Sequence, residues 1–375
     1  MNQPLRILHP NFHRGWGGQA NRILTLSRKL AAWGHYVVIA APAGSQLAQR
    51  AKAAGIAVFE ECRFRRGFHP VIFCRDILAL RGLIRREKID IIHTHGAQDT
   101  WVGVMAAKLA GVPIKIVRTR HNIFPVARSL VNRLLYGRWL DWLIVISLGV
   151  KEVYIRAGLM DPQSITVIYS AIDLERFRPS LDGSALRAEL KIGADTPLVG
   201  MVGRLEPEKG YPYFLEAARR VKEKLPSARF VIAGQGSLEN SLKEQARELG
   251  LFEALTFLGF RPDVPAILAA LDVFVLSSLA EGLGTSALEA LATAKPVVAS
   301  SVGGLPESVR HEETGLLVPP KDVEALAEGI LRLLNNKAWA QELGQAGRRL
   351  MEAEFNEETL AKKTLEVYYK VMSEK

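Results

Sequence analysis

Two loops in the second half of the chain carry residues that could bind a diphosphate, and each follows an apolar segment of strand length. The first is Gly203-Arg204-Leu205-Glu206-Pro207-Glu208-Lys209-Gly210, directly after the segment 198–202. The guanidinium of Arg204 can fork onto two phosphate oxygens, and the ammonium of Lys209 can follow them as a mobile point charge. The alternative is a charged loop that is simply solvated, and the spacing of the two cations alone favours that alternative.

The second loop places glycines between two glutamates, Glu281 and Glu289. The glycines loosen the turn that follows an apolar strand, and a helix is predicted to begin near Thr285. Its free amides and its dipole would attract phosphate. Glu289, about one turn inside the helix, could accept hydrogen bonds from the vicinal hydroxyls of a ribose, as acidic residues do in other nucleotide sites. Two glutamates at this spacing are common by chance, but a glycine-rich strand-to-helix turn between them is much less so.

A third glycine-rich turn, Gly15-Trp16-Gly17-Gly18, follows the first predicted strand and precedes a helix. Glycines at such a place let the backbone approach a ligand closely, and the helix N-terminus offers N–H groups to an anion. A turn that merely connects strand to helix explains the same residues equally well. The spacing also differs from the GxGxxG pattern of dinucleotide sites.

Short β-branched segments alternate with amphipathic segments of helix length, in two series. Predicted strands cover residues 5–9, 36–40, 89–93, 114–118, 143–146 and 165–168, then 198–202, 229–233, 255–258, 273–276 and 296–299. This alternation predicts an α/β protein of two doubly wound, Rossmann-like parallel-sheet domains, residues 1–178 and 179–356. Ligands of such sheets bind beyond the carboxyl ends of the strands, so the site is expected in the interdomain cleft. A last helix, at about 357–375, is predicted to pack back on the first domain.

Composition excludes several classes of protein. Hydrophobic residues make up 48% of the 375 residues and charged residues 23%, which excludes intrinsic disorder and fibrous classes. Cys62 and Cys74 form no CxxC pair, so neither a disulfide scaffold nor a thiolate zinc site is expected. No apolar run approaches the roughly 18 residues needed to span a bilayer, and no signal peptide is visible. A cytoplasmic protein, soluble or peripheral to the membrane, is therefore expected.

The positive charge lies in the first half of the chain. Residues 1–178 contain 26 Lys and Arg against 11 Asp and Glu, a net of +15, and residues 179–375 contain 23 against 28, a net of −5. This asymmetry suggests an anionic partner for the first half: a membrane surface, a nucleic acid or a phosphorylated substrate. The segment 126–140 interleaves arginines with apolar residues and could be an amphipathic helix lying on an anionic bilayer. Packing of its apolar face on the core explains the segment equally well, but the charge of the whole half favours the membrane.

Taken together, the motifs resemble the retaining nucleotide-sugar glycosyltransferases of family 4 (GT4), which have the GT-B fold. Glu281 to Glu289 match the E-x7-E signature of that family, and Gly203-Arg204 with Lys209-Gly210 match its GR-x4-KG loop. Val302-Gly303-Gly304-Leu305-Pro306-Glu307 resembles a late loop of the family, so the resemblance covers nearly the whole chain. The segment Trp16-Gly17-Gly18-Gln19 is similar to a segment of the glycosyltransferases of bacterial lipopolysaccharide core assembly.

The resemblance implies a role for each matched residue. Those it assigns to donor or nucleotide binding are Gly17, Gly18, Arg204, Lys209, Leu283, Gly284, Thr285, Ser286 and Glu289. His121, in Arg120-His121-Asn122, aligns with a histidine near the reacting sugar, and Glu281 would face the donor sugar or order its loop. The cations would stabilise charge on the departing diphosphate, so no bound metal and no cofactor is expected beside a UDP or GDP sugar.

The function implied is transfer of a hexose, with retention, from a nucleotide-diphosphate sugar to a membrane-associated glycan or lipid-linked acceptor in bacterial envelope (lipopolysaccharide) biosynthesis. The expected partners are that donor, that acceptor and an anionic membrane surface on the cytoplasmic side. A nucleotide-sugar epimerase of the same fold stays open, and it would consume donor without an acceptor. A basic nucleic-acid-binding protein is the third possibility, but no recognisable nucleic-acid motif and no repeated aromatic stacking platform support it.

Overall fold

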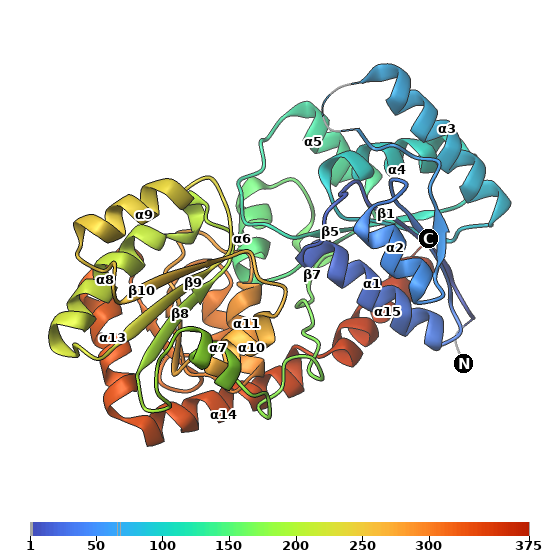
Figure 1. Ribbon diagram of the computed structural model, residues 1–375. Helices are drawn as coiled ribbons and strands as arrows, with labels where there is room; N and C mark the ends of the chain where they lie inside the picture. Colours follow the sequence, from blue (N-terminus) through green and yellow to red (C-terminus); the bar gives the residue numbers. More distant parts are fainter. Residues whose placement is uncertain (1–2, 66, 68, 375) are drawn as a thin grey trace. The chain divides into compact units, whose positions relative to one another are not determined.

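The computed structural model describes residues 3–65, 67 and 69–374, and the chain divides into two units (Figure 1). Unit 1 comprises Met1–Ala171 and Glu357–Lys375, and unit 2 comprises Ile172–Asn356. The sequence pattern placed the boundary at 178/179, whereas unit 2 already begins at Ile172. The reason is local: the amide of Ile172 donates to the carbonyl of Phe355 at 2.8 Å, and Arg348 Nη1 donates to the carbonyl of Phe177 at 2.7 Å. These bonds tie the turn-rich segment to unit 2.

Unit 1 is built on a seven-stranded parallel sheet with the order β3-β2-β1-β4-β5-β6-β7. Its strands are β1 (Arg6–Pro10), β2 (Tyr36–Ala40), β3 (Ala57–Phe59), β4 (Ile91–Thr94), β5 (Lys115–Arg120), β6 (Trp142–Val145) and β7 (Ile165–Val167). Its helices are α1 (Gly18–Ala32), α2 (Gln46–Ala53), α3 (Pro70–Arg86), α4 (Ala97–Ala110), α5 (Leu130–Leu134), α6 (Leu148–Ala157) and α15 (Glu357–Ser373), with a π-helical turn at Leu135–Trp139 and a 3-10 turn at Pro162–Ser164. The strand order reverses at β1 and β4, which makes that edge the expected ligand edge of unit 1.

Unit 2 is built on a six-stranded parallel sheet with the order β10-β9-β8-β11-β12-β13. Its strands are β8 (Leu198–Val202), β9 (Arg229–Ala233), β10 (Leu255–Gly259), β11 (Val273–Leu276), β12 (Val297–Ser300) and β13 (Leu316–Val318). Its helices are α7 (Ser184–Glu189), α8 (Tyr211–Lys224), α9 (Glu239–Glu248), α10 (Val264–Ala270), α11 (Thr285–Ala292), α12 (Leu305–Ser308), α13 (Val323–Asn335) and α14 (Lys337–Glu354), with a 3-10 turn at Pro207–Lys209. The order reverses at β8 and β11. The predicted α/β class with two doubly wound parallel sheets is confirmed.

The last helix of the chain, α15, belongs to unit 1 and packs against α1 (Figure 1). Its Leu360 and Tyr368 share a buried core with Ile91 of β4 and Trp142 of β6. The hydroxyl of Tyr368 lies 2.6 Å from Nδ1 of the fully buried His93, so a polar contact inside the core also fixes the helix. Hydrophobic burial provides most of the attachment, and the hydrogen bond specifies how the helix is seated.

We expect Tyr368→Phe to lower the stability of unit 1 by about 1–3 kcal/mol, because the substitution leaves a buried imidazole nitrogen without its partner. Thermal unfolding followed by circular dichroism measures the loss. Tyr369→Phe is the matched control, since the adjacent hydroxyl donates to the carbonyl of Gln3 at 3.2 Å near the surface. Equal melting temperatures for the two variants would show that the contact with His93 contributes nothing.

The segment 126–140 does not form the single amphipathic helix that its pattern suggested. Helix α5 begins at Leu130, because the Ser129 hydroxyl caps it by accepting from the amide of Asn132 at 3.2 Å. After Leu134 the chain continues as the π-helical turn. Leu135 and Tyr136 are buried, whereas Leu130 is 82% exposed, so part of the apolar face packs on the core and part does not. Among the described residues, no helix combines the length and the hydropathy that crossing a bilayer requires.

Candidate functional site

The reversal of strand order in unit 2 brings the two phosphate-binding candidate loops together. The loop 203–210 leaves the carboxyl end of β8, and the loop 277–284 leaves the carboxyl end of its neighbour β11. Ser277 Oγ donates to the carbonyl of Gly210 at 2.9 Å, and the amide of Leu279 donates to the carbonyl of Glu208 at 2.8 Å. A Cβ on Gly210 would lie 2.0 Å from the carbonyl oxygen of Ser277, and its φ is +67°. Only glycine fits this approach, so the contact between the loops is built into the sequence.

Lys209 and Glu281 form an ion pair within these loops. Lys209 Nζ contacts Glu281 Oε1, and the two side chains are only 15% and 10% exposed. Ser278 Oγ donates to the same carboxylate oxygen at 2.9 Å. The sequence assigned Lys209 to the diphosphate and Glu281 to the sugar or to the loop, and it did not anticipate that they pair. The ion pair fixes the ammonium of Lys209 at the carboxyl edge of the sheet. The ammonium has three N–H donors, of which the carboxylate accepts one, so two can donate to a ligand.

Arg204 is placed differently from Lys209. Its side chain is 70% exposed, and Nη2 donates to Glu208 Oε1 at 2.9 Å, one turn along the loop. It also lines a cavity of about 230 Å³ together with Gln235 and Phe260. An exposed pair of this kind contributes little to stability, so the guanidinium is available to a ligand. The guanidinium of Arg204 and the apolar wall of the cavity together suit a phosphate group that is attached to a flat ring.

The turn from Leu283 to Ser286 forms the start of α11, as predicted. Gly284 has a φ of +78°, and a Cβ there would lie 2.3 Å from Leu305 Cδ2. Glycine therefore permits the tight entry into the helix at Thr285. The first amides of a helix have no partner within it. Among the described residues, the buried Ser286 Oγ also lacks a hydrogen-bond partner. An anion could accept hydrogen bonds from these donors at the N-terminus of α11.

Glu289 lies one turn inside α11 and is partly buried. Burial raises the pKa of its carboxyl to about 7, and the opposing effect of the Arg176 charge is smaller. The carboxylate is thus held where ionisation is costly, without an ion pair among the described residues. Burial destabilises the ionised form of Glu289 in the free chain. A ligand that binds the carboxylate would explain its position, so the residue is a candidate for ligand binding.

In unit 1, Gly17 and Gly18 follow β1 and begin α1. Gly17 caps the helix in an extended conformation, with φ −177°. A Cβ on Gly17 would meet nothing within 4 Å. The described structure therefore does not require glycine at position 17, and the open approach to the helix N-terminus stays consistent with the predicted ligand contact.

His121 follows β5 and belongs to a row of histidines that the sequence motifs do not indicate. Its Nε2 lies 3.3 Å from His95 Nδ1, and His95 Nε2 lies 3.1 Å from Nδ1 of His9. Burial lowers the pKa of all three imidazoles, that of His9 to about 3, so they are neutral at physiological pH. A neutral imidazole has one donor and one acceptor nitrogen, so the row couples the tautomer of His121 to those of the other two. The available signal was that His9 and His93 end predicted strands.

The cluster of His9, His93 and His95 does not suit a metal ion. Nitrogens of the three side chains lie within 4.8 Å of one another. However, His93 Nε2 lies 2.7 Å from Thr119 Oγ1 and its Nδ1 is bonded to Tyr368, so both nitrogens are engaged. The cluster contains no carboxylate, and the buried Arg22 guanidinium acts on it as a positive charge that lowers the pKa of His93 and His95. The charge of Arg22 would repel a divalent cation there.

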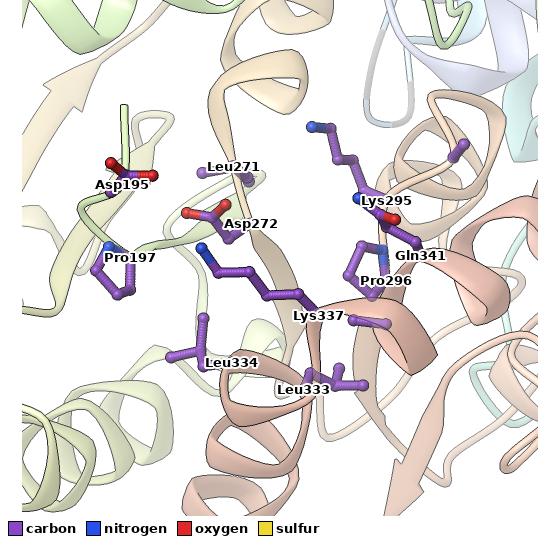
Figure 2. A pocket seen from close by; sticks show the side chains of 12 residues that line it. Asp195, Pro197, Leu271, Asp272, Lys295, Pro296, Leu333, Leu334, Lys337 and Gln341 are labelled. Carbon is purple, nitrogen blue, oxygen red and sulfur yellow. The ribbon is translucent and has the colours of Figure 1, made fainter. Parts of the chain in front are cut away.

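A further cavity of about 160 Å³ lies in unit 2 at the opposite edge of the sheet (Figure 2). Its walls include Pro197, Asp272 and Pro296, which directly precede β8, β11 and β12. These are the amino ends of the strands, whereas doubly wound sheets bind their ligands at the carboxyl ends. Lys295 in this wall donates to the carbonyl of Ala269 at 2.7 Å. The cavity is therefore separate from the candidate site.

Comparison with known proteins gives the same result for both units. Residues 16–176 match the family model described as Glycosyltransferase Family 4, and residues 183–350 match that of Glycosyl transferases group 1. A relative from Escherichia coli, UDP-Gal:alpha-D-GlcNAc-diphosphoundecaprenol alpha-1,3-galactosyltransferase, is 35% identical over 294 residues, which is 72% of this chain and 76% of the relative.

Two solved structures resemble the chain over almost its whole length. A glycosyltransferase from Rickettsia africae has a TM-score of 0.89 at 20% identity and covers 100% of both chains. Anabaena HepE in complex with UDP and glucose has a TM-score of 0.84 at 23% identity and covers 98% of this chain and 100% of its own. At these identities the likeness concerns the fold.

Proposed function

The chain belongs to glycosyltransferase family 4 and is a glycosyltransferase with the GT-B fold, and on this premise we propose that it transfers a hexose from a nucleotide-diphosphate sugar, with retention, to a lipid-linked glycan of the bacterial envelope. The observation that carries the proposal is the carboxyl edge of the sheet of unit 2, where the loop with Arg204 and Lys209 contacts the loop that leads into α11. Two cations and a helix N-terminus suit one diphosphate. The apolar cavity beside Arg204 suits the base.

Catalysis then follows from the charge that develops on the leaving group. As the bond between the anomeric carbon and the diphosphate oxygen breaks, negative charge grows on that oxygen, and the fixed cations stabilise it more in the transition state than in the ground state. The acceptor hydroxyl forms the new bond on the same face, and its proton passes to the departing phosphate. Glu289 holds the ribose, and His121 acts beside the reacting sugar. These charges make a bound metal unnecessary.

The acceptor is proposed from the printed name of the Escherichia coli relative and from the basic character of unit 1. That relative acts on a sugar linked through a diphosphate to undecaprenol, with UDP-galactose as donor. Residues 1–178 carry a net charge of +15, and Phe124, Leu130 and Val131 are exposed apolar side chains among arginines. A membrane-peripheral enzyme that works on the cytoplasmic side, in the assembly of lipopolysaccharide or a related glycan, combines these features.

UDP or GDP is expected to raise the melting temperature of the chain, because a ligand that binds only the folded state stabilises it. The shift should persist in EDTA, since no metal is needed to hold the diphosphate. Arg204→Ala should remove most of the shift, whereas Arg247→Ala, a matched loss of an exposed arginine on α9, should not. If neither nucleotide shifts the wild-type chain, the proposed donor site is wrong.

A further inference from the structure

Unit 1 contains a buried arginine to which no described residue supplies an anion. Arg118 lies in β5 and is only 4% exposed. Among the described residues its Nε has no hydrogen-bond partner and its guanidinium takes part in no ion pair; the group lies 5.4 Å above the centre of the Tyr136 ring. Burying a guanidinium without a counter-ion is costly. The position therefore fits an anion that comes from outside the chain.

Arg120 completes a two-cation site with Arg118. Because the two residues are two apart on a strand, their side chains point to the same face. Both line a cavity of about 190 Å³ with Trp101, Asn132 and Tyr136, and none of the described residues in its wall is acidic. The Nε of Arg120 has no partner among the described residues, and its Nη2 makes only a long bond of 3.4 Å to the carbonyl of Phe124.

Asp99 is a carboxylate close enough to Arg118 for the positive charge to lower its pKa, but it forms no ion pair with Arg118 among the described residues. Its Oδ2 accepts from the amides of His95 and Gly96, both at 2.9 Å, so it caps helix α4. Burial raises the pKa of this carboxyl to about 6, against the lowering effects of those amides and of Arg118. The guanidinium therefore stays available to a ligand phosphate.

A larger, apolar cavity adjoins the arginine cavity. It has a volume of about 460 Å³, and Trp101 lines both cavities. Phe73, Val102 and Val131 supply its apolar wall. Asp76 also lines it, but that carboxylate accepts from the amides of Arg63 and Phe64 and is satisfied by the backbone. Helices α3, α4 and α5 contribute these residues (Figure 1).

We propose that unit 1 binds a lipid-linked phosphate in which Arg118 and Arg120 hold the phosphate groups and the cavity beside Trp101 takes the first part of the hydrocarbon chain. The proposal rests on the proposed function, and it names the class of acceptor: an amphiphile with an anionic link between sugar and chain. Charge complementarity selects the anion, since the described wall of the arginine cavity offers two guanidinium groups and no carboxylate. The exposed apolar rim, with Leu130 82% and Val131 57% exposed, gives the chain a path from a bilayer.

Binding of three compounds tests the phosphate site and the chain site separately. They are farnesyl diphosphate, farnesol and inorganic pyrophosphate. With the donor site filled by saturating UDP or GDP, whichever shifts the melting temperature, we expect the intact chain to bind farnesyl diphosphate at least tenfold more tightly than either of the other two, by calorimetry or by quenching of tryptophan fluorescence. Arg118→Gln should weaken farnesyl diphosphate at least tenfold, which corresponds to about 1.4 kcal/mol. Val131→Asn, which adds a polar group without a charge, should weaken farnesyl diphosphate but leave pyrophosphate unchanged. Arg138→Gln, which removes an exposed arginine, is the matched control and should bind like the wild type.

Each contrary outcome overturns a stated part of the proposal. If Arg118→Gln and Arg138→Gln bind farnesyl diphosphate equally well, the proposed phosphate site is wrong. If pyrophosphate binds as tightly as farnesyl diphosphate, the proposed chain site is wrong. If Arg118→Gln fails to fold, Arg120→Gln replaces it with the same expectation. The shift of melting temperature with UDP or GDP is measured on every variant. A preserved nucleotide shift with no specific lipid binding overturns only this inference, whereas loss of that shift in the wild type overturns the proposed function.

Discussion

Lys209→Met is expected to reduce kcat/KM for sugar transfer by a factor of about 10²–10³, the cost that removal of one fixed donor to a developing oxyanion commonly carries. Methionine keeps most of the length of the side chain and removes its charge. Lys209 sits on the edge of unit 2, held by Glu281 with both side chains little exposed. A fixed ammonium needs no reorganisation when charge grows on the diphosphate, and this is why its loss should affect kcat as well as KM. Initial rates with a lipid-linked acceptor measure the effect.

The control for Lys209→Met separates catalysis from folding. The single variant leaves the carboxylate of Glu281 buried without its cation, which is destabilising by about 3–5 kcal/mol in comparable buried pairs. Lys209→Met combined with Glu281→Gln removes both charges, and Ser278 can still donate to the remaining amide oxygen. We expect the double variant to regain the melting temperature and not the activity. Recovery of transfer in the double variant would mean that the pair only supports the loop.

Three strands of unit 2 could be predicted to the residue because of how they are buried. The predicted segments 198–202, 229–233 and 273–276 coincide with β8, β9 and β11. Parallel strands covered on both faces are continuous apolar runs that stop where the chain leaves the core. Strands β3 and β13, of three residues each, were not predicted, although β7, also of three residues, was. The segment 126–140 was misread because hydrophobic periodicity does not reveal the Ser129 cap or the π-helical turn that shorten its helix.

The sequence indicates which residues belong to the candidate site but not which of them contact each other. The loop motifs led to Arg204, Lys209 and Glu289, and the rule on reversed strand order led to the edge where they lie. That Lys209 pairs with Glu281 depends on which loops the sheet brings together, and a motif read along the chain does not contain that information. The histidine row likewise joins β1 to the segments that follow β4 and β5, which are far apart in sequence. Tertiary pairing, which local pattern does not encode, accounts for both omissions.

Glu289→Gln is expected to stabilise the free protein at pH 8 while weakening its hold on the donor. The carboxyl has a pKa of about 7 in the folded chain, raised by burial from an ordinary value of 4.5. Between these two values the folded state keeps the proton that the unfolded chain has lost, so the free energy of unfolding falls as the pH rises and the full penalty applies above pH 7. The difference corresponds to at most about 3 kcal/mol, and partial exposure reduces it.

The same substitution should cost about tenfold to a hundredfold in affinity for a UDP-sugar, because hydrogen bonds from ribose hydroxyls to a charged acceptor contribute about 1.5–3 kcal/mol. Affinity of the wild type should also fall as the pH drops below 7, since the ligand favours the ionised carboxylate; the variant should lose this dependence. Melting temperatures at pH 5 and 8, followed for the transition that nucleotide shifts, and calorimetric titrations across the same range measure both effects. Glu328→Gln on α13, an exposed glutamate, is the matched control. A Glu289→Gln variant that is no more stable than the wild type at pH 8, yet binds the donor equally well, would show that the carboxylate is neither strained nor used.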